Sequence, residues 1–373
     1  MQPGTRIHSV EIYKLMVPLK EPFVISLGPI NEVQNIIVVI HTADGCTGFG
    51  ECSPYMSING ESIDTCFIVG QYFARVLKGH DALDIEGCML KMDKTIYANT
   101  SIKSAFDIAL HDIAAQQAGV PVYKYLGGEK NKQLETDMTV SIGTPEKMQA
   151  DATRFKEEGF PAIKVKLSGD VQMDHQRIRA IREGIGMDIP LQLDANQGWE
   201  NVPRALEILN LLKDYNIRFC EEPILRSRFM ELSELKKASP IPIMADECCG
   251  DHLDAERLIQ LDACHMFNIK LGKSSGFFKG KKIAELGAKH DMQMQVGGFM
   301  ESRLGMTAAA HLALLNQHIK YCDFDTPLMF TEDPVTGGIQ YGANGVVEVP
   351  DVPGLGATID AQYLRNAEKV VID

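Results

Sequence analysis

Residues 162–194 read AIKVKLSGDVQMDHQRIRAIREGIGMDIPLQLD, and this stretch decides the fold. A short apolar strand is predicted over residues 162–167 and a second over 191–194. Between them, residues 173–183 carry apolar side chains at helical spacing. Strands that alternate with helices along the chain are typical of parallel strands joined by crossover helices. The stretch therefore predicts an α/β protein.

The same alternation of strand and helix repeats from about Thr139 to about Phe324. Strands are predicted at 139–142, 162–167, 191–194, 218–221, 243–245, 266–270, 293–296 and 321–324, with helices such as 146–158, 173–183, 202–215 and 277–290 between them. Regularly spaced units of this kind fit a βα barrel better than an open sheet. An open dinucleotide-binding sheet would also show an early Gly-rich turn, and none appears.

The first part of the chain has a different order, with strands before helices. Residues 10–17 and 36–42 are rich in β-branched side chains, whereas 61–78 and 101–118 show helical spacing of apolar residues. This order predicts a separate α+β domain ahead of the barrel.

Bulk composition excludes several classes of protein. The 373 residues carry a net charge of −13, which argues against a nucleic-acid partner. No apolar run reaches the length of a membrane span, and the first residues lack the pattern of a signal peptide. The nine cysteines show no paired C-x-x-C spacing. We expect a cytoplasmic enzyme with reduced thiols that does not bind membranes.

Three consecutive barrel strands end in a carboxylate, namely Asp194, Glu221 and Asp246. The C-terminal ends of barrel strands meet at one rim, where these three charges would repel one another. A divalent cation resolves that repulsion, and ligands that are all oxygen favour Mg²⁺ over Zn²⁺. The alternative is that each acid caps the helix after its strand, a common role for one such residue but not for three in succession.

Two lysines share one face of the second strand, because side chains alternate and Val165 must face the helices. Lys164 and Lys166 therefore point into the barrel, where mutual repulsion and burial should lower a lysine pKa toward that of a useful base. Lys270 ends the sixth strand, across the barrel. The alternatives are lysines that reach solvent from an edge strand and, for Lys270, a lysine paired with a rim carboxylate.

The eighth strand ends in Asp323-Phe324-Asp325, and both acids should face the interior by the same alternation. A pair of carboxylates suits a cationic group on a substrate. A helix cap or a loop cap is again the alternative.

Taken together, these residues resemble the muconate-lactonizing subgroup of the enolase superfamily. The resemblance covers nearly the whole chain and includes the segments DANQGW at 194–199 and ADE at 245–247. It implies a (β/α)7β barrel at 128–330, an N-terminal α+β capping domain at 1–127 and a C-terminal segment at 331–373 that packs back on the capping domain. It also implies one Mg²⁺ per subunit, held by Asp194, Glu221 and Asp246.

Within that subgroup, the Asp323-x-Asp325 pair is similar to the dipeptide epimerases, in which the acids hold the free ammonium group of the substrate. The resemblance implies 1,1-proton transfer through an enediolate, with Lys166 and Lys270 acting on opposite faces of the α-carbon. The residues implied in substrate binding are Thr139, Lys164, Gly298, Met300, Asp323 and Asp325.

The residues of the capping-domain loops narrow the range of possible substrates. L-Ala-D/L-Glu epimerases carry an arginine in the first loop, and none occurs near Gly28; the second loop, at 54–58, is largely apolar. A glutamate side chain buried there would lack a partner. The chain looks closer to the D-Ala-D-Ala type of epimerase, with small or hydrophobic dipeptides as substrates. Lys20 lies near enough in sequence to leave glutamate dipeptides open.

Four rival functions remain open. N-acylamino-acid racemases and cycloisomerases use the same scaffold, but their substrates have no free ammonium for the acid pair. A non-catalytic binding protein would be expected to have lost a ligand or a lysine. An unrelated aldolase would form a Schiff base with Lys270. The family commonly assembles, so a homo-oligomer is also open.

Overall fold

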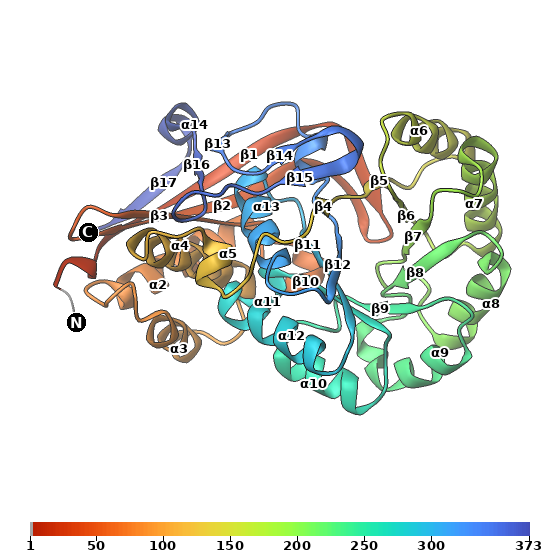
Figure 1. Ribbon diagram of the computed structural model, residues 1–373, viewed down its shortest axis with the longest axis horizontal. Helices are drawn as coiled ribbons and strands as arrows, with labels where there is room; N and C mark the ends of the chain where they lie inside the picture. The colour runs from red at the N-terminus through yellow and green to blue at the C-terminus, as the bar shows by residue number, and fades with distance from the viewer. Residues whose placement is uncertain (1–2) are drawn as a thin grey trace.

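The computed structural model describes residues 3–373 and contains two large sheets (Figure 1). One is a four-stranded antiparallel sheet near the chain ends, and the other is an eight-stranded parallel sheet ringed by helices. Among these residues, no helix has the length and apolarity needed to cross a membrane. The predicted fold, a βα barrel with an N-terminal α+β domain, is confirmed.

The antiparallel sheet has the strand order β17-β1-β2-β3. Its first three strands are β1 (Ile7–Ile25), β2 (Gly28–Thr42) and β3 (Thr47–Cys52), and the helices on it are α2 (Ile63–Leu77), α3 (Ile85–Thr95) and α4 (Thr100–Gln117). Helix α4 packs on β3 and also on barrel helices α11 and α12, so it lies between the two parts of the molecule. Gly48 and Gly50 make this approach possible, because a side chain at either position would collide with the α4 backbone.

The barrel strands follow one another in sequence order around the ring. They are β5 (Met138–Val140), β6 (Ile163–Lys166), β7 (Leu191–Asp194), β8 (Ile217–Glu221), β9 (Ile243–Ala245), β10 (Met266–Lys270), β11 (Gln293–Gly297) and β12 (Ile319–Cys322). A bridge between Thr136 and Cys322 joins the first strand region to the last. Every predicted strand overlaps an observed one, because local periodicity was enough to find them.

Helices cover the outside of the ring (Figure 1). They are α6 (Pro145–Glu157), α7 (Val171–Ile185), α8 (Val202–Leu212), α9 (Leu232–Ala238), α10 (His252–Gln260), α11 (Leu271–Ser274), α12 (Phe277–Lys289) and α13 (Arg303–Ala313). Short helices lie at α1 (Met56–Asn59), α5 (Val122–Tyr125), η1 (Pro3–Thr5), η2 (Arg226–Glu231), η3 (Thr326–Met329) and η4 (Ala343–Gly345).

The last part of the chain returns to the first. It contains β13 (Val335–Gly337), β14 (Gln340–Tyr341), β15 (Val346–Glu348), β16 (Ala357–Ile359), α14 (Ala361–Asn366) and β17 (Lys369–Ile372), and β15 pairs with β4 (Leu134–Glu135). Strand β17 pairs antiparallel with β1, from Val10 opposite Ile372 to Tyr13 opposite Lys369. The end of the chain therefore completes the sheet of the N-terminal domain.

A buried glutamate holds the N-terminal domain to the barrel. Glu51, in β3, accepts hydrogen bonds from the backbone N–H of Ser302 (2.9 Å) and of Gly305 (2.7 Å), at the start of α13. It also accepts from the Ser302 hydroxyl (2.7 Å) and from Asn35 (2.6 Å). A carboxylate at a helix N-terminus satisfies orphan N–H groups and favours the helix dipole. This contact positions the capping domain over the barrel mouth.

Candidate active site

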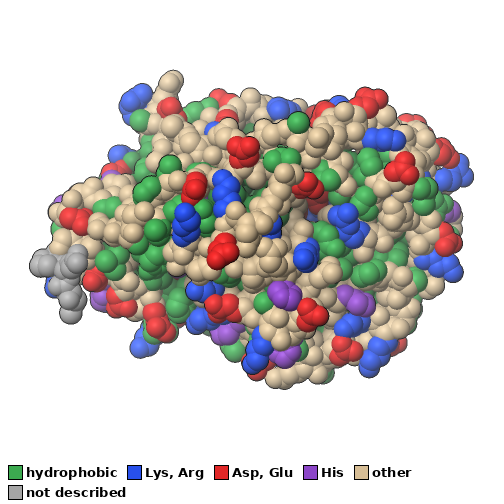
Figure 2. Space-filling view, in the orientation of Figure 1, with side chains coloured by type: hydrophobic (Ala, Val, Ile, Leu, Met, Phe, Trp, Pro, Cys, Tyr) green, Lys and Arg blue, Asp and Glu red, His purple; other side chains and the backbone are tan. Residues whose placement is uncertain are grey.

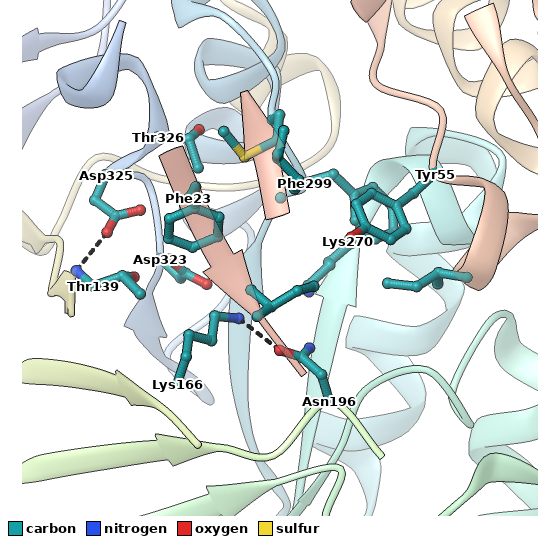
Figure 3. Close-up of a pocket in the computed structure, with 15 residues that line it drawn as sticks. Phe23, Tyr55, Thr139, Lys166, Asn196, Lys270, Phe299, Asp323, Asp325 and Thr326 are labelled. Atoms are coloured by element: carbon teal, nitrogen blue, oxygen red, sulfur yellow. Dashed lines mark hydrogen bonds between the residues drawn. The ribbon is translucent and has the colours of Figure 1, made fainter. Parts of the chain in front are cut away.

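A pocket lies at the C-terminal ends of the barrel strands, beneath loops of the N-terminal domain (Figure 3). It is lined by Phe23, Ile25, Ile30, Tyr55, Ile58, Thr139, Lys166, Asn196, Lys270, Gly298, Phe299, Met300, Asp323, Asp325 and Thr326. The set includes both predicted catalytic lysines and five of the six predicted substrate-binding residues. Lys164, the sixth, lies just beneath the pocket and is 1% exposed.

The three predicted metal ligands lie below the pocket floor, each with no exposed surface. Asp194 and Glu221 are register partners on adjacent strands, and Asp246 directly follows β9. Lys164 bridges the first two, with its Nζ 3.2 Å from Asp194 Oδ2 and 2.9 Å from Glu221 Oε2. Burial raises the pKa of Asp194, but the charges of Lys166 and Lys164 lower it by more, so that its pKa is about 2. Burial and the neighbouring Asp194 charge raise the pKa of Glu221 to about 7.

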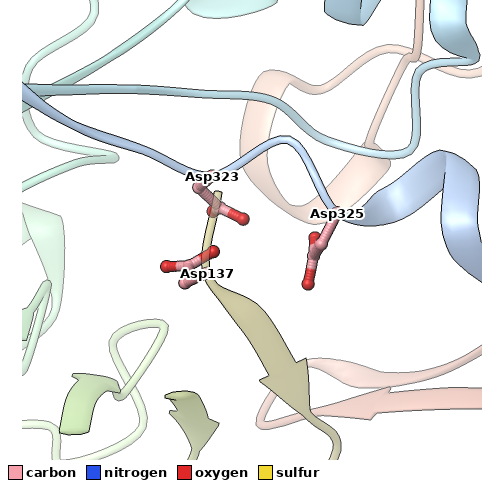
Figure 4. A group of neighbouring side chains, drawn as sticks. All are labelled: Asp137, Asp323 and Asp325. Atoms are coloured by element: carbon pink, nitrogen blue, oxygen red, sulfur yellow. The ribbon is translucent and has the colours of Figure 1, made fainter. Parts of the chain in front are cut away.

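The tightest carboxylate group in residues 3–373 is a different one (Figure 4). Oxygens of Asp137, Asp323 and Asp325 lie within 4.8 Å of one another, and all three residues are buried. The predicted triad does not meet this spacing, because lysine ammonium groups lie between its members. Sequence reasoning missed Asp137, although it lies two residues before Thr139 and so shares the inward face of that strand.

The two candidate bases come from opposite sides of the ring, on the second and sixth strands. Lys166 Nζ donates to Asp194 Oδ2 (2.6 Å) and to Asn196 Oδ1 (3.2 Å). Lys270 Nζ donates to Asp246 Oδ2 (2.8 Å) and lies 5.1 Å from the centre of the Phe299 ring. Each lysine therefore pairs with one outer member of the acid triad.

The prediction that burial and mutual repulsion lower the pKa of the lysines on the second strand is wrong for Lys164. Burial does lower the pKa of Lys164, but Asp323, Glu221 and Asp194 raise it well above its ordinary value. Burial is likewise outweighed at Lys270, where Asp246 and Glu221 raise the pKa. The prediction counted the lysines on one strand, whereas the folded site surrounds each of them with carboxylates.

Asp246 is oriented by Lys273, which the sequence analysis did not single out, and by Glu222, which follows Glu221 in the sequence. Lys273 is buried and donates to Asp246 Oδ1, to the Asp246 carbonyl (2.5 Å) and to the Asn268 carbonyl (2.9 Å). The Asp246 backbone N–H donates to Glu222 Oε2 (2.7 Å). The signal for Lys273 was its position one helical turn after Lys270.

Loops of the N-terminal domain are fastened over the pocket. The Ser26 hydroxyl donates to the Asn196 carbonyl (3.0 Å), and Arg226 donates to the Ile58 carbonyl (2.5 Å). Lys20, in contrast, is not among the lining residues, and its Nζ donates to the Leu328 carbonyl (2.8 Å). In this arrangement Lys20 does not supply a cation to the pocket.

Two family models match the chain. The model described as "Mandelate racemase / muconate lactonizing enzyme, N-terminal domain" matches residues 7–127. The model described as "Enolase C-terminal domain-like" matches residues 147–363.

Relatives of known function match over nearly their whole length. A D-Ala-D/L-Ala epimerase of Cytophaga hutchinsonii is 55% identical, over 98% of this chain and 100% of the relative. An L-Ala-D/L-Glu epimerase of Bacillus subtilis is 34% identical, again over 98% and 100%.

Solved structures of an epimerase and a racemase also match over nearly the whole chain. The dipeptide epimerase of Cytophaga hutchinsonii, complexed with Mg and the dipeptide D-Ala-L-Val, is 55% identical, has a TM-score of 0.98 and is matched over 99% of this chain and 100% of its own. An N-succinyl Arg/Lys racemase of Bacillus cereus is 30% identical, with a TM-score of 0.95 and coverage of 99% and 100%.

Proposed function

This chain belongs to the mandelate racemase/muconate lactonizing enzyme family of the enolase superfamily, and on that premise we propose that it is a dipeptide epimerase. It is an isomerase, and the reaction proposed is inversion of the α-carbon of the C-terminal residue in small or hydrophobic dipeptides of the Ala-Ala type. The observation that carries the proposal is that Asp323 and Asp325 line the same pocket as Lys166 and Lys270.

The residues fit a single Mg²⁺ at Asp194, Glu221 and Asp246. The donor set is all oxygen and is fully buried. The Asp137, Asp323 and Asp325 group is the competitor, but the first set lies directly beside both lysines, where the carboxylate of a substrate must bind. A bound Mg²⁺ would stabilise the negative charge that develops on that carboxylate when the α-proton leaves.

The lysines would move the proton. Lys166 removes it from one face of the α-carbon, and protonated Lys270 returns one to the opposite face, so that the configuration inverts. The roles are exchanged for the other stereoisomer. Lys164, buried beneath them, adds positive charge beside the substrate carboxylate.

The acid pair would fix the other end of the dipeptide. Asp323 and Asp325 accept the free ammonium group, while Thr139, whose backbone N–H donates to Asp325 Oδ2 (2.7 Å), keeps one of these carboxylates in place. Holding both ends orients the α-carbon between the two lysines. The hairpin and loop above the pocket would exclude water from the reacting groups.

The pocket walls favour apolar substrate side chains. Phe23, Ile25, Tyr55, Ile58 and Phe299 supply the walls, and the only basic residues among the lining set are the two lysines. A glutamate side chain would have no partner there, and burial of an unpaired carboxylate is costly. All nine cysteines are unpaired, which supports a reducing compartment, so we keep a cytoplasmic location as part of the proposal.

The test is incubation with a dipeptide library and Mg²⁺ in deuterated water. We expect deuterium at the C-terminal α-carbon of Ala-Ala type dipeptides and little in dipeptides that end in glutamate. Exchange confined to glutamate dipeptides would favour an L-Ala-D/L-Glu epimerase, and exchange confined to N-acylamino acids would refute the dipeptide assignment. Borohydride trapping of a carbonyl substrate on Lys270 would instead support the aldolase reading.

A further inference from the structure

Closure of the barrel brings Asp137 to the acid pair. Asp137 lies in the link between β4 and β5, next to Thr136, which bridges to Cys322 at the end of β12. The Phe324 backbone N–H donates to the Thr136 hydroxyl (2.8 Å), and the Asp137 N–H donates to the Cys322 carbonyl (3.4 Å). These contacts hold Asp137 beside Asp323 (Figure 4).

The spacing of the three carboxyls suits an ammonium ion. Three oxygens no more than 4.8 Å apart all lie within 4.8 Å divided by the square root of three, or about 2.8 Å, of a common point. That is the length of a charge-assisted N–H···O bond. A primary ammonium group offers three such N–H donors, one for each of Asp137, Asp323 and Asp325.

The protein does not supply enough cations to this group. Lys164 Nζ lies 2.7 Å from Asp323 Oδ2, but neither Asp137 nor Asp325 forms an ion pair with a lysine or arginine anywhere in residues 3–373. Oδ1 of Asp137 and Oδ1 of Asp325 are buried without any donor. Buried carboxylates are normally paired, so the missing cation is expected to come with a ligand.

The other oxygen of Asp137 faces the barrel interior. With the Gln192 amide oriented to suit both neighbours, its nitrogen donates to Asp137 Oδ2 (2.6 Å) and its oxygen accepts from Arg218 (2.9 Å). Gln192 therefore anchors Oδ2, whereas Oδ1 is buried without a donor. Burial, with the charges of Asp323 and Asp325, raises the pKa of Asp137 well above its ordinary value, and burial and Asp323 raise the pKa of Asp325 to about 7. A bound ammonium group would favour the ionised form of all three.

We propose that Asp137 is the third carboxyl of the ammonium subsite, which contacts the substrate ammonium group from the barrel interior while Asp323 and Asp325 contact it from the rim. This role rests on the proposed dipeptide epimerase function. It adds a specificity residue to that function, because a substrate without a free ammonium group would leave all three acids uncompensated.

The kinetic test compares wild type with Asp137→Asn and Asp137→Ala on D-Ala-D-Ala. We expect both variants to raise KM roughly tenfold or more, as for loss of a hydrogen bond to a charged group, with kcat changed much less and the Mg²⁺ concentration for half activation unchanged. N-acetyl-D-Ala-D-Ala, which has no ammonium group, should inhibit wild type and variants equally. An unchanged KM in both variants, or an equal loss of affinity for the acetylated peptide, would overturn the role.

A second test does not depend on the epimerase reaction. Ethylammonium chloride should raise the melting temperature of the wild type more than tetramethylammonium chloride at the same concentration, since the latter has no N–H donor, and Asp137→Asn should remove most of the difference. If potassium chloride stabilises as well as ethylammonium, the cluster binds inorganic cations and the proposal fails. If wild type shows the ethylammonium effect but no exchange in any dipeptide, only the proposed function fails.

Asp112→Asn is the matched control for removing a buried carboxylate. Asp112 is 3% exposed and accepts from the backbone N–H groups of Phe49 (3.0 Å) and Leu355 (2.8 Å), outside the pocket. This variant should lose stability but keep the KM for D-Ala-D-Ala and the ethylammonium effect. Should Asp137→Ala fail to fold, the isosteric Asp137→Asn still decides the question.

Discussion

At the scale of single residues, the role proposed for each charged group in the site depends on its ion-pair partners more than on its residue type. Lys166 and Lys270 are both inward lysines at strand ends, yet one pairs with Asp194 and the other with Asp246. The acids differ in the same way: Asp194 and Asp246 form ion pairs with lysines that line the pocket, whereas Asp325 forms no ion pair with a lysine in residues 3–373. These differences lead to separate expectations for each residue.

Lys166→Ala should abolish α-proton exchange from one stereoisomer of a substrate dipeptide and partly spare the other. The loss of one positioned base costs about 10²–10⁴-fold in rate, and Lys270 remains for the opposite face. NMR of the α-proton in deuterated water, with each stereoisomer supplied alone, measures this directly. Equal exchange from both stereoisomers would contradict the two-base scheme.

Asp323→Asn and Asp194→Asn should affect different steps, the first the binding of the dipeptide and the second the binding of Mg²⁺. The first should raise KM for the dipeptide while Mg²⁺ affinity stays within about twofold, because Asp323 is assigned to the ammonium group. The second should weaken Mg²⁺ binding roughly tenfold or more, because Asp194 is assigned to the metal. Calorimetric titration with Mg²⁺ alone, beside steady-state kinetics, separates them. A greater loss of Mg²⁺ affinity in Asp323→Asn would move the metal to the Asp137, Asp323 and Asp325 group.

At the scale of secondary-structure elements, the site depends on contacts between the two domains. The β1–β2 hairpin is fastened to the barrel where the Ile142 N–H donates to the Val24 carbonyl (2.9 Å) and the Val24 N–H donates to the Ser141 hydroxyl (2.6 Å). At the start of α13, β3 supplies the Glu51 contact described above. The apolar lid, formed by Phe23, Ile25, Ile30, Tyr55 and Ile58 of the N-terminal domain, is therefore held at a fixed distance above the lysines.

Glu51→Ala should destabilise the protein by about 3 kcal/mol or more, since it leaves the N–H groups of Ser302 and Gly305 and the Asn35 amide without their acceptor in a buried interface. Urea unfolding measures the loss. Glu207→Ala, at an exposed position of α8, is the control and should change stability by less than about 0.5 kcal/mol. Similar losses in the two variants would show that Glu51 does not join the domains.

At the scale of the whole molecule, the buried acids link stability to pH. Burial and Glu51 raise the pKa of Glu301 from 4.5 to about 8. The native state then binds a proton that the unfolded state has lost, so stability falls as pH rises through this window. Burial raises the pKa of Glu222 to about 7, so this residue also makes stability fall as pH rises.

Glu301→Gln should flatten part of this dependence. Between pH 5 and pH 8 the free energy of unfolding of the variant should rise relative to that of the wild type by at most about 1.4 kcal/mol per pH unit, because the amide does not ionise. Urea unfolding at the two pH values, without Mg²⁺ or dipeptide, gives the comparison, and the slope due to Glu222 cancels between the proteins. A difference that is constant with pH would mean that Glu301 does not titrate in this range.

The sequence by itself determined the order of strands and helices, the inward face of each strand and the family resemblance. These properties are local, because side chains alternate with a period of two along a strand and 3.6 along a helix. Lys164, Lys166 and Lys270 could be identified as inward lysines for this reason, and the apolar lid could be predicted from the residues of two loops.

Only the tertiary structure decided which charges meet. Asp137 and Asp323 belong to the first and last strand regions of the ring and become neighbours because the barrel closes between Thr136 and Cys322. The pKa of Lys164 rises rather than falls as predicted, and that of Lys270 rises as well, because several strand ends bring carboxylates to the same buried space. Charge interactions depend on distance in space and on burial, and neither quantity is contained in the spacing of residues along the chain.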